Sequence, residues 1–186
     1  MARLRMIRHA PALHGGALAG RRDVGADLGN GAALAALRAR LGAAERVISS
    51  PAQRCVQTTA ALFPDISFAQ DPRLWEQDFG AWESVPFEAL PDLGPLSRTE
   101  LAAHRPPGGE SFGDLCARVW PALQEIAAGG DAVIIAHAGV IRAGLAQAVA
   151  TLPAGMAFEI APLSVTELRL IAGHGWSIAH VNWCAP

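Results

Sequence analysis

Two neighbouring residues near the amino terminus, Arg8 and His9, have the chemistry to handle a phosphoryl group. They follow the first hydrophobic run of the chain, and a histidine at the carboxyl end of a buried strand can attack phosphorus covalently. A phosphomonoester dianion also needs lasting positive charge. Arg8 and Arg54 can supply it, because a guanidinium does not deprotonate and binds phosphate oxygens in a bidentate manner. His137, which ends another hydrophobic run, could add a hydrogen bond, or a charge if it is protonated.

A leaving alkoxide also needs a proton, and Glu76 is the best candidate for the general acid. The same carboxylate could then deprotonate the water that attacks a phosphohistidine. Asp78 and Glu83 lie close by in the sequence, and a loop carboxylate is often only solvated, so this role is a hypothesis. Phosphoryl transfer depends mostly on positioning and charge stabilisation. We therefore expect neither a metal nor an organic cofactor.

The composition favours one globular domain over residues 1–186, because 51% of the residues are hydrophobic and only 17% are charged. The net charge of −2 gives no electrostatic reason to expect a nucleic acid or an anionic membrane as a partner. The 3 cysteines lie far apart, which favours a reduced, cytoplasmic location. The uncharged stretch 143–158 contains Pro153 and Gly155, so it predicts a buried helix and loop rather than a membrane span.

The order of hydrophobic runs and turn residues predicts alternating strands and helices. The expected strands are residues 3–7, 46–49, 66–68 and 131–137, followed by an antiparallel hairpin of 164–171 and 176–181. The expected helices are residues 32–41, 52–63, 111–128 and 140–150. Residues 10–30 should form a long loop, and residues 71–109 an irregular excursion with one or two short helices. These elements predict an α/β fold, namely a three-layer α/β/α sandwich with a mostly parallel central sheet and an antiparallel edge hairpin.

Spacing within the helices predicts which side chains face the core. The expected inward residues are Val56, Ala60 and Phe63 in the second helix, and Leu115, Val119 and Leu123 in the third. Ser111 and Asp114 have the spacing of a capping box at the start of the third helix. Parallel sheets bind ligands beyond the carboxyl ends of their strands, and His9, Ser50 and His137 all fall at such ends. Segments remote in sequence should therefore converge on one crevice.

Five segments, taken in order, match the pattern of a known family. They are Arg8 to Ala10, Ser49 to Ala60, Trp75 to Glu83, Gly108 to Ser111 and Ala136 to Gly139. In order and spacing they resemble the histidine phosphatase superfamily, which includes the cofactor-dependent phosphoglycerate mutases, over residues 4–142. The resemblance implies that His9 is the phosphorylated nucleophile. It also implies that Arg8, Arg54 and His137 form the phosphate pocket and that Glu76 is the proton donor.

The sequence departs from the family pattern at Ala10, Pro11 and Ala138, which leaves the chemistry intact and bears on substrate identity. The block 20–23 resembles one in the α-ribazole phosphatases of the late cobalamin pathway. The substrate is therefore expected to be a small phosphorylated metabolite, with α-ribazole 5′-phosphate as one candidate. The chain lacks the long insert and tail that mutases share, which favours a phosphatase. Phosphoglycerate mutase-type phosphoryl transfer and non-catalytic binding of a phospholigand are the alternatives.

Four residues are candidates for contacts with the rest of the substrate. Arg21 or Arg22 could reach the phosphate or a ribose hydroxyl, and Trp82 could form a wall of the pocket. Glu110 could bind substrate, or it could cap the helix that follows it. The uncharged strand edge near Val181 could pair with a second copy of the chain, so a homodimer is a further hypothesis.

Overall fold

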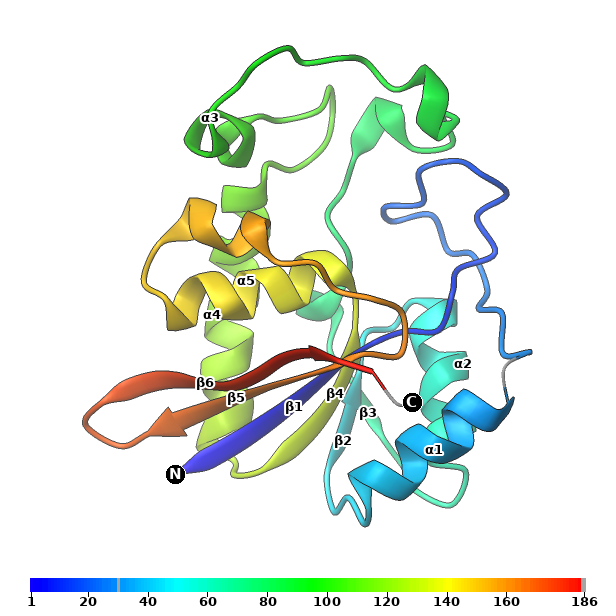
Figure 1. The fold of residues 1–186 in the computed structure, drawn as a ribbon, viewed down its shortest axis with the longest axis vertical. Coiled ribbons are helices and arrows are strands. Elements are labelled where there is room, and N and C mark those ends of the chain that lie inside the picture. The colour runs from blue at the N-terminus through cyan, green and yellow to red at the C-terminus, as the bar shows by residue number, and fades with distance from the viewer. Residues whose placement is uncertain (30, 185–186) are drawn as a thin grey trace.

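The computed structural model of the protein describes residues 1–29 and 31–184 and contains the expected mixed sheet (Figure 1). Its strands are β1 (Ala2–Arg8), β2 (Val47–Ser49), β3 (Ala69–Gln70), β4 (Ala132–Ala136), β5 (Val165–Ile171) and β6 (Gly175–Trp183). They lie in the order β3-β2-β4-β1-β5-β6. The pairs among β1, β2, β3 and β4 are parallel, while β5 runs antiparallel to β1 and β6. The predicted mostly parallel sheet with an antiparallel hairpin is confirmed, whereas pairing of the edge strand β6 with a second copy stays a prediction.

Helices cover both faces of the sheet and complete the three layers (Figure 1). They are α1 (Gly31–Leu41), α2 (Gln53–Leu62), α3 (Arg98–Ala103), α4 (Phe112–Ala128) and α5 (Ala138–Ala148). Successive side chains of β1 point to opposite faces of the sheet. Met6 packs in the core with α4 and α5, and Ile7 packs in the core with α1 and α2. The central strand β4 is buried at every position, as expected of a strand with a parallel neighbour on each side.

The predicted inward face of α2 is wrong at two of its three residues, since only Phe63, at the end of the helix, is buried. Ala60 is exposed and Val56 is only partly buried. The side chains that the helix buries are Arg54, Cys55, Thr58, Thr59 and Leu62. Thr58 and Thr59 each donate their hydroxyl to the carbonyl oxygen four residues earlier, both at 2.7 Å, so neither is buried unpaired. Hydrophobic spacing is a poor guide here because part of the inward face of α2 borders a polar site.

The predicted strand over residues 66–68 is also wrong, since β3 comprises Ala69–Gln70. The backbone N–H of Ile66 donates to the carbonyl of Phe63 at 3.3 Å, so the chain is still turning away from α2 at this point. Ile66 and Phe68 instead pack their side chains against the core beneath α1 and α2. Their hydrophobicity therefore reflects burial of side chains rather than pairing of the backbone.

The helices on either side of β4 follow the prediction. Ser111 accepts the backbone N–H of Asp114, whose carboxylate accepts the N–H of Ser111 in return, and α4 then runs to Ala128, with Gly129 as its C-cap. The three residues predicted to face inward from α4 are buried. The uncharged stretch 143–158 forms the end of α5 and the 3₁₀-helix η4 (Leu152–Ala157), as expected. In the described part of the chain, no helix combines the length and apolarity that a membrane crossing requires.

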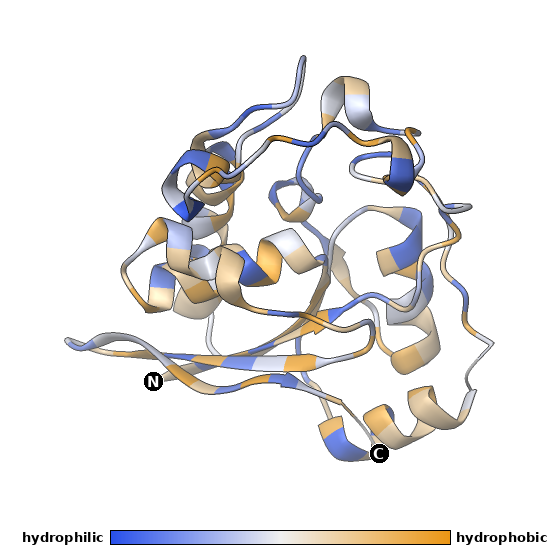
Figure 2. Ribbon diagram, turned by 45° about the horizontal axis from the view of Figure 1, so that its top comes forward, coloured by the Kyte–Doolittle hydropathy of each residue, from blue (hydrophilic) through white to orange (hydrophobic). Residues whose placement is uncertain are grey.

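Two irregular segments, residues 9–29 and the excursion 71–109, rise over one edge of the sheet (Figure 1). The excursion contains α3 and three single-turn 3₁₀-helices, so its short helices are more numerous than expected. The 3₁₀-helices are η1 (Pro72–Leu74), η2 (Gly80–Trp82) and η3 (Phe87–Ala89). Ala17 and Pro86 form an isolated bridge, so the two segments touch each other. In Figure 2 these upper segments alternate between hydrophilic and hydrophobic stretches, as is typical of chain that covers a core rather than filling it.

Candidate active site

The two candidate histidines follow neighbouring strands and lie against each other. His9 follows β1 and His137 follows β4, and the register of these strands places Arg8 beside Ala136. The backbone N–H of His9 donates to the carbonyl of Ala136 at 3.0 Å, which extends the strand pairing to the site. The centroids of the two imidazole rings are 5.1 Å apart in an edge-to-face arrangement. The structure therefore brings these two predicted site residues together at the carboxyl edge of the sheet.

His9 is held as the neutral tautomer that a nucleophile requires. Its Nδ1 lies 2.6 Å from the carbonyl oxygen of Ala10, to which it must donate, while Nε of Arg54 donates to its Nε2 at 3.3 Å. Burial lowers the pKa of His9 to about 3; the hydrogen bond to Ala10 opposes this shift, and the charges of Arg54 and Arg8 reinforce it. At neutral pH the ring therefore keeps a lone pair on Nε2.

The guanidinium of Arg54 is buried, with the residue only 1% exposed, and it is held by two loop carbonyls. Besides its contact with His9, it donates to the carbonyl oxygens of Arg22 at 2.8 Å and of Gly20 at 2.7 Å. A guanidinium has five N–H donors, so these three contacts leave two for an oxyanion. Gly20 has a φ of 52°, and a Cβ there would lie 2.2 Å from an oxygen of Glu83, so the loop needs glycine to fold over Arg54.

His137 is fully buried among polar, sulfur and aromatic groups. Its Nε2 lies 2.9 Å from Oγ of Ser50 and 3.5 Å from Sγ of Cys55, and the ring of Trp75 stacks on it with a centroid distance of 6.3 Å. Burial lowers the pKa of His137 well below its usual value, and neighbouring cationic groups add to the shift. In the free protein at neutral pH, His137 is therefore an uncharged hydrogen-bonding group.

Arg8 and Glu76 add a guanidinium and a carboxyl group to the site. Arg8 donates to the carbonyl of Ile160 at 2.6 Å, and its buried Nε has no hydrogen-bond partner among the described residues. Burial lowers the pKa of Arg8, and the carboxylate of Glu76 opposes that effect. Glu76 accepts the backbone N–H of Gln77 at 3.0 Å and of Gly139 at 3.3 Å, so it lies at the first turn of α5. A Cβ on Gly139 would lie 2.2 Å from the Glu76 carboxylate, so this approach requires glycine.

Arg118, on α4, fixes the segment that carries Glu76. One terminal nitrogen donates to the carbonyl oxygens of Arg73 at 2.7 Å and Trp75 at 2.8 Å, and the other donates to that of Glu76 at 2.8 Å. The guanidinium also binds the carboxylate of Glu110, with Nε and a terminal nitrogen each 2.9 Å from an oxygen. These contacts attach the acid-bearing loop to a long helix of the core.

The excursion is closed at its base by a narrow neck just beyond Glu76. The backbones of residues 78–81 and 107–110 pair there through hydrogen bonds of 2.9 and 2.7 Å. A Cβ on Gly80 or Gly109 would lie 2.2 or 2.6 Å from a carbonyl oxygen of the opposite segment. Glycine at both positions is therefore what allows the two segments to meet.

Three of the four residues predicted to contact the rest of the substrate form hydrogen bonds or ion pairs with other protein groups. Burial opposes ionisation of Glu110, but the hydrogen bonds and charge of Arg118 hold its pKa below the usual range. Ser111, not Glu110, caps α4. Arg21 is exposed and lies 3.2 Å from the Glu110 carboxylate, and Arg22 donates to the carbonyl of Leu18 at 3.3 Å. Contact of these three side chains with a substrate stays a prediction.

Two adjoining hollows open at this edge of the sheet. The first, of about 220 Å³, is bordered by Arg8, His9, Arg54 and Glu76 together with side chains of the two upper segments. The second, of about 270 Å³, shares Glu76 and Phe79 with the first and includes Trp82, the fourth predicted contact residue. Across residues 1–29 and 31–184, no group of three or more histidine, cysteine, aspartate and glutamate side chains is arranged to hold a metal ion.

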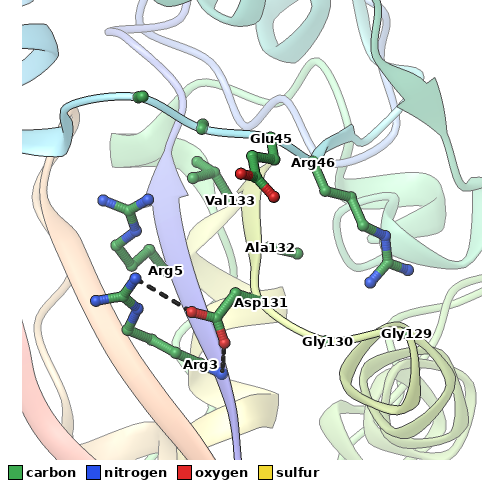
Figure 3. Close-up of a pocket in the computed structure, with 11 residues that line it drawn as sticks. Arg3, Arg5, Glu45, Arg46, Gly129, Gly130, Asp131, Ala132 and Val133 are labelled. Atoms are coloured by element: carbon green, nitrogen blue, oxygen red, sulfur yellow. Dashed lines mark hydrogen bonds and ion pairs between the residues drawn. The ribbon is translucent and has the colours of Figure 1, made fainter.

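A larger hollow, of about 650 Å³, lies at the opposite edge of the sheet, near the amino-terminal ends of β1 and β4 (Figure 3). Arg3 forms an ion pair with Asp131 there at 3.1 Å, and Figure 3 shows the side chain of Arg46 directed away from this pair. The other charged residues of its lining are Arg5 and Glu45. This lining includes no histidine, cysteine, serine or threonine. A histidine and a carboxyl group occur together in the lining of the first hollow, with His9 and Glu76, and not in that of the larger one.

The comparison with protein families agrees with the five ordered segments. A model of the histidine phosphatase superfamily (branch 1) matches residues 5–184. The chain belongs to this superfamily. The match spans nearly the whole chain, from within β1 to beyond β6, so the resemblance inferred from the sequence is confirmed.

Similar proteins include both longer chains and single histidine phosphatase folds. A bifunctional protein of Mycobacterium tuberculosis is 38% identical over 112 residues, which are 58% of this chain and 29% of that protein. The 6-phosphofructo-2-kinase/fructose-2,6-bisphosphatase of Caenorhabditis elegans is 30% identical over 105 residues, 54% of this chain and 23% of that one. This chain therefore spans only 29% and 23% of the length of these two relatives.

Among solved structures, mycobacterial glucosyl-3-phosphoglycerate phosphatase with inorganic phosphate has a TM-score of 0.84 and 25% identity, covering 100% of this chain and 99% of that one. The α-ribazole phosphatase of Shigella flexneri has a TM-score of 0.82 and 18% identity, covering 97% and 96%, and at that identity it indicates the fold alone. These matches confirm the α/β fold predicted from the sequence.

Four residues that shape this candidate site are absent from the predicted set. Ser50, Cys55 and Trp75 contact His137, and Arg118 fixes the acid loop. Ser50, Cys55 and Trp75 lie within segments that match the family pattern but were not assigned a role there, whereas Arg118 lies outside these segments, in α4. A usable signal exists only for Arg118, because its place three residues after buried Leu115 turns it partly toward the core.

Proposed function

We propose that the chain is a phosphomonoester hydrolase that forms a phosphohistidine at His9. The observation that carries the proposal is the state of this ring: Nδ1 is committed to Ala10, and Nε2 meets an N–H of Arg54 at 3.3 Å. His9 borders the hollow that Arg8, Arg54 and Glu76 also line. The superfamily membership supports the same assignment, and the names of the structural relatives support a phosphatase.

In the proposed first step, Nε2 of His9 attacks phosphorus and a P–N bond forms as the ester P–O bond breaks. The leaving oxygen takes its proton from Glu76, which becomes a carboxylate. In the second step this carboxylate takes a proton from water, whose oxygen attacks phosphorus. The P–N bond then breaks, inorganic phosphate leaves and His9 regains its lone pair. The protonation state of Glu76 is thereby restored after each turnover.

We assign the remaining groups to the transferring phosphoryl group. Arg8 and Arg54 balance the charge of the dianion, and the two uncommitted N–H groups of Arg54 suit its oxygens. His137, oriented by Ser50 at 2.9 Å, adds a hydrogen bond. The scheme needs no metal, so turnover should persist after chelation with EDTA. Loss of activity that zinc or magnesium restores would contradict this part of the proposal.

We propose a small phosphorylated metabolite as the substrate and a cytoplasmic location. The resemblance of residues 20–23 to a block of the α-ribazole phosphatases favours α-ribazole 5′-phosphate as the first compound to test. In this block the backbone carbonyls of Gly20 and Arg22 accept hydrogen bonds from Arg54. A panel of phosphorylated metabolites that contains this compound should show which is hydrolysed with the highest kcat/KM. Conversion of 3-phosphoglycerate in the presence of trace bisphosphoglycerate, without release of phosphate, would instead favour a mutase.

The nucleophile is tested by trapping the covalent intermediate. A ³²P-labelled substrate, quenched during turnover, should leave label on the protein that is stable in alkali and lost in acid. The label should be absent in His9→Ala and retained in His174→Ala, because His174 is exposed in the turn between β5 and β6. Label of the same chemical stability in His9→Ala would contradict the assignment of His9.

A further inference from the structure

The second hollow has the position that the leaving group of the ester needs. In the proposed function, which this inference presupposes, Glu76 protonates the leaving oxygen and must lie beside it. Glu76 and Phe79 border both hollows. A substrate whose phosphoryl group lies at His9 can therefore extend past Glu76 into the second hollow.

The walls of this hollow are mostly apolar. Aromatic rings of Phe79 and Trp82 and aliphatic side chains of Leu93, Leu101 and Met156 line it. Trp82 is held in place by His104, whose ring stacks on it with centroids 5.3 Å apart and an interplanar angle of 20°. A space of about 270 Å³ with such walls favours a flat or hydrophobic group over a heavily hydroxylated one.

One cation interrupts the apolar walls. Arg142, on α5, also lines the hollow, and its Nε donates to the carbonyl of Phe158 at 2.9 Å. Within residues 1–29 and 31–184 it forms no ion pair with a carboxylate, so its charge is not neutralised by the protein. An anionic group on the ligand would supply the missing partner through a charge-assisted hydrogen bond.

We propose that the substrate is a phosphomonoester whose leaving group has a hydrophobic ring and an acidic substituent. The ring occupies the second hollow against Trp82 and Leu93, and the acid binds Arg142. The first hollow offers a competing path for the leaving group, because Leu18 and Phe87 border it on the side of the long loop. The two paths differ in which leucine the ring contacts, so they are separable by mutation.

Binding to the His9→Ala variant tests the proposal without depending on turnover. Three phosphates of primary alcohols serve as probes: glycerol 3-phosphate, 2-phenylethyl phosphate and the phosphate of 4-(2-hydroxyethyl)benzoate. We expect the phenyl compound to bind about tenfold more tightly than the glycerol compound, by calorimetry, because it buries a ring. The carboxylated compound should bind on the order of tenfold more tightly again. Equal dissociation constants for the three would overturn the proposal.

Matched variants on the His9→Ala background show which side chain is responsible for each gain in binding affinity. Arg142→Gln should remove the gain from the carboxylate and keep that from the ring, whereas Arg40→Gln, an exposed helical arginine that lies over Trp183, should keep both. Leu93→Gln should reduce the gain from the ring, and Leu18→Gln should leave it unchanged. The reverse pattern for the two leucines would overturn the proposal by placing the ring in the first hollow.

Measuring hydrolysis of the probes by the unsubstituted protein distinguishes failure of this inference from failure of the proposed function. Hydrolysis of all three probes with equal kcat/KM would leave the phosphatase in place and overturn the inference. Tight binding in the expected order without hydrolysis of any phosphomonoester would support the ligand class and contradict the proposed function.

Discussion

Burial makes both site imidazoles neutral, with His9 4% and His137 0% exposed. A neutral His9 retains the lone pair that attacks phosphorus, and a neutral His137 retains its short contact with Ser50. Protonation of either ring would add a third cation beside Arg8 and Arg54 in a poorly hydrated space. The free site therefore holds two guanidinium charges and the Glu76 group, which leaves it electrostatically ready for a dianion.

The depressed pKa of His9 predicts how stability changes with pH. Below the usual histidine pKa of about 6.5, the unfolded chain takes up a proton that the folded chain, with a pKa of about 3, does not. Stability should therefore fall as the pH drops from 6.5 toward 3, and at pH 5 this group alone should cost about 2 kcal/mol. Urea unfolding at pH 7.5 and pH 5.0 measures the loss, which His9→Gln should reduce by that amount.

An exposed histidine provides the control for this pH effect. His174 is exposed, so His174→Gln should keep the pH dependence of the unsubstituted protein. If His9→Gln and the unsubstituted protein lost the same free energy between the two pH values, His9 would not be the buried neutral base described here.

At the scale of elements, the acid loop depends on α4 for its position. Arg118 reaches three carbonyl oxygens of the loop and a carboxylate at once. Arg118→Lys keeps the charge but cannot form this fork of hydrogen bonds. We expect kcat for an alkyl phosphate to fall by a factor on the order of ten to a hundred, because Glu76 is displaced, and kcat for nitrophenyl phosphate, which needs little protonation, to fall much less.

The leaving-group dependence distinguishes a positioning role from a merely structural one. Arg105→Lys is the matched control, since Arg105 pairs with Asp114 on the surface at 2.7 Å and contacts no part of the acid loop in the described structure. Equal losses with both kinds of ester in Arg118→Lys would show that Arg118 supports the fold rather than Glu76.

Elements with strong hydrophobic spacing or clear caps were predictable, and those whose burial is polar were not. β4 is predicted by its run of hydrophobic residues, all of which are buried, and the start of α4 is predicted by the capping box at Ser111. The inward face of α2 escaped prediction because it buries Arg54 and two threonines that pair with their own helix. Hydrophobicity reports burial in a core and says little about burial beside a charged site.

The site itself was predictable where a residue stands at the end of a strand. His9 and His137 follow β1 and β4, and sheet topology alone brings them together. Helical spacing places Arg118 partly toward the core, but the contacts of Arg118 and Glu110 could not be predicted, because they include backbone carbonyls and amides whose positions depend on tertiary structure. Arg21, expected near the substrate, pairs with Glu110, and its contact with a substrate stays a prediction.

At the scale of the whole molecule, the site is a junction of four segments remote in sequence. Residues 8–9, 54 and 76 meet in one hollow, and 137 lies against 9. An anion that bridges them should stabilise the fold, and inorganic phosphate at one hundred times its dissociation constant should raise the free energy of unfolding by about 2.7 kcal/mol. Denaturant unfolding with and without phosphate measures the increment.

The phosphate increment should depend on the buried arginine. In Arg54→Met it should be largely lost whatever the stability of the variant without phosphate, whereas Arg40→Met should keep it. An unchanged increment in Arg54→Met would mean that phosphate binds elsewhere on the protein.

The neck between residues 78–81 and 107–110 joins the two ends of the segment between them, so this segment can vary independently of the rest of the fold. The neck already holds the two ends of the intervening segment together. The entropic cost of closing that segment into a loop therefore grows only slowly with its length. Glu76 and Arg118 lie outside this boundary. The segment from about Phe87 to Arg105 could therefore be replaced by one of another length and composition while the reacting groups keep their geometry. Such grafting would change which phosphate esters the site accepts without changing its catalytic residues.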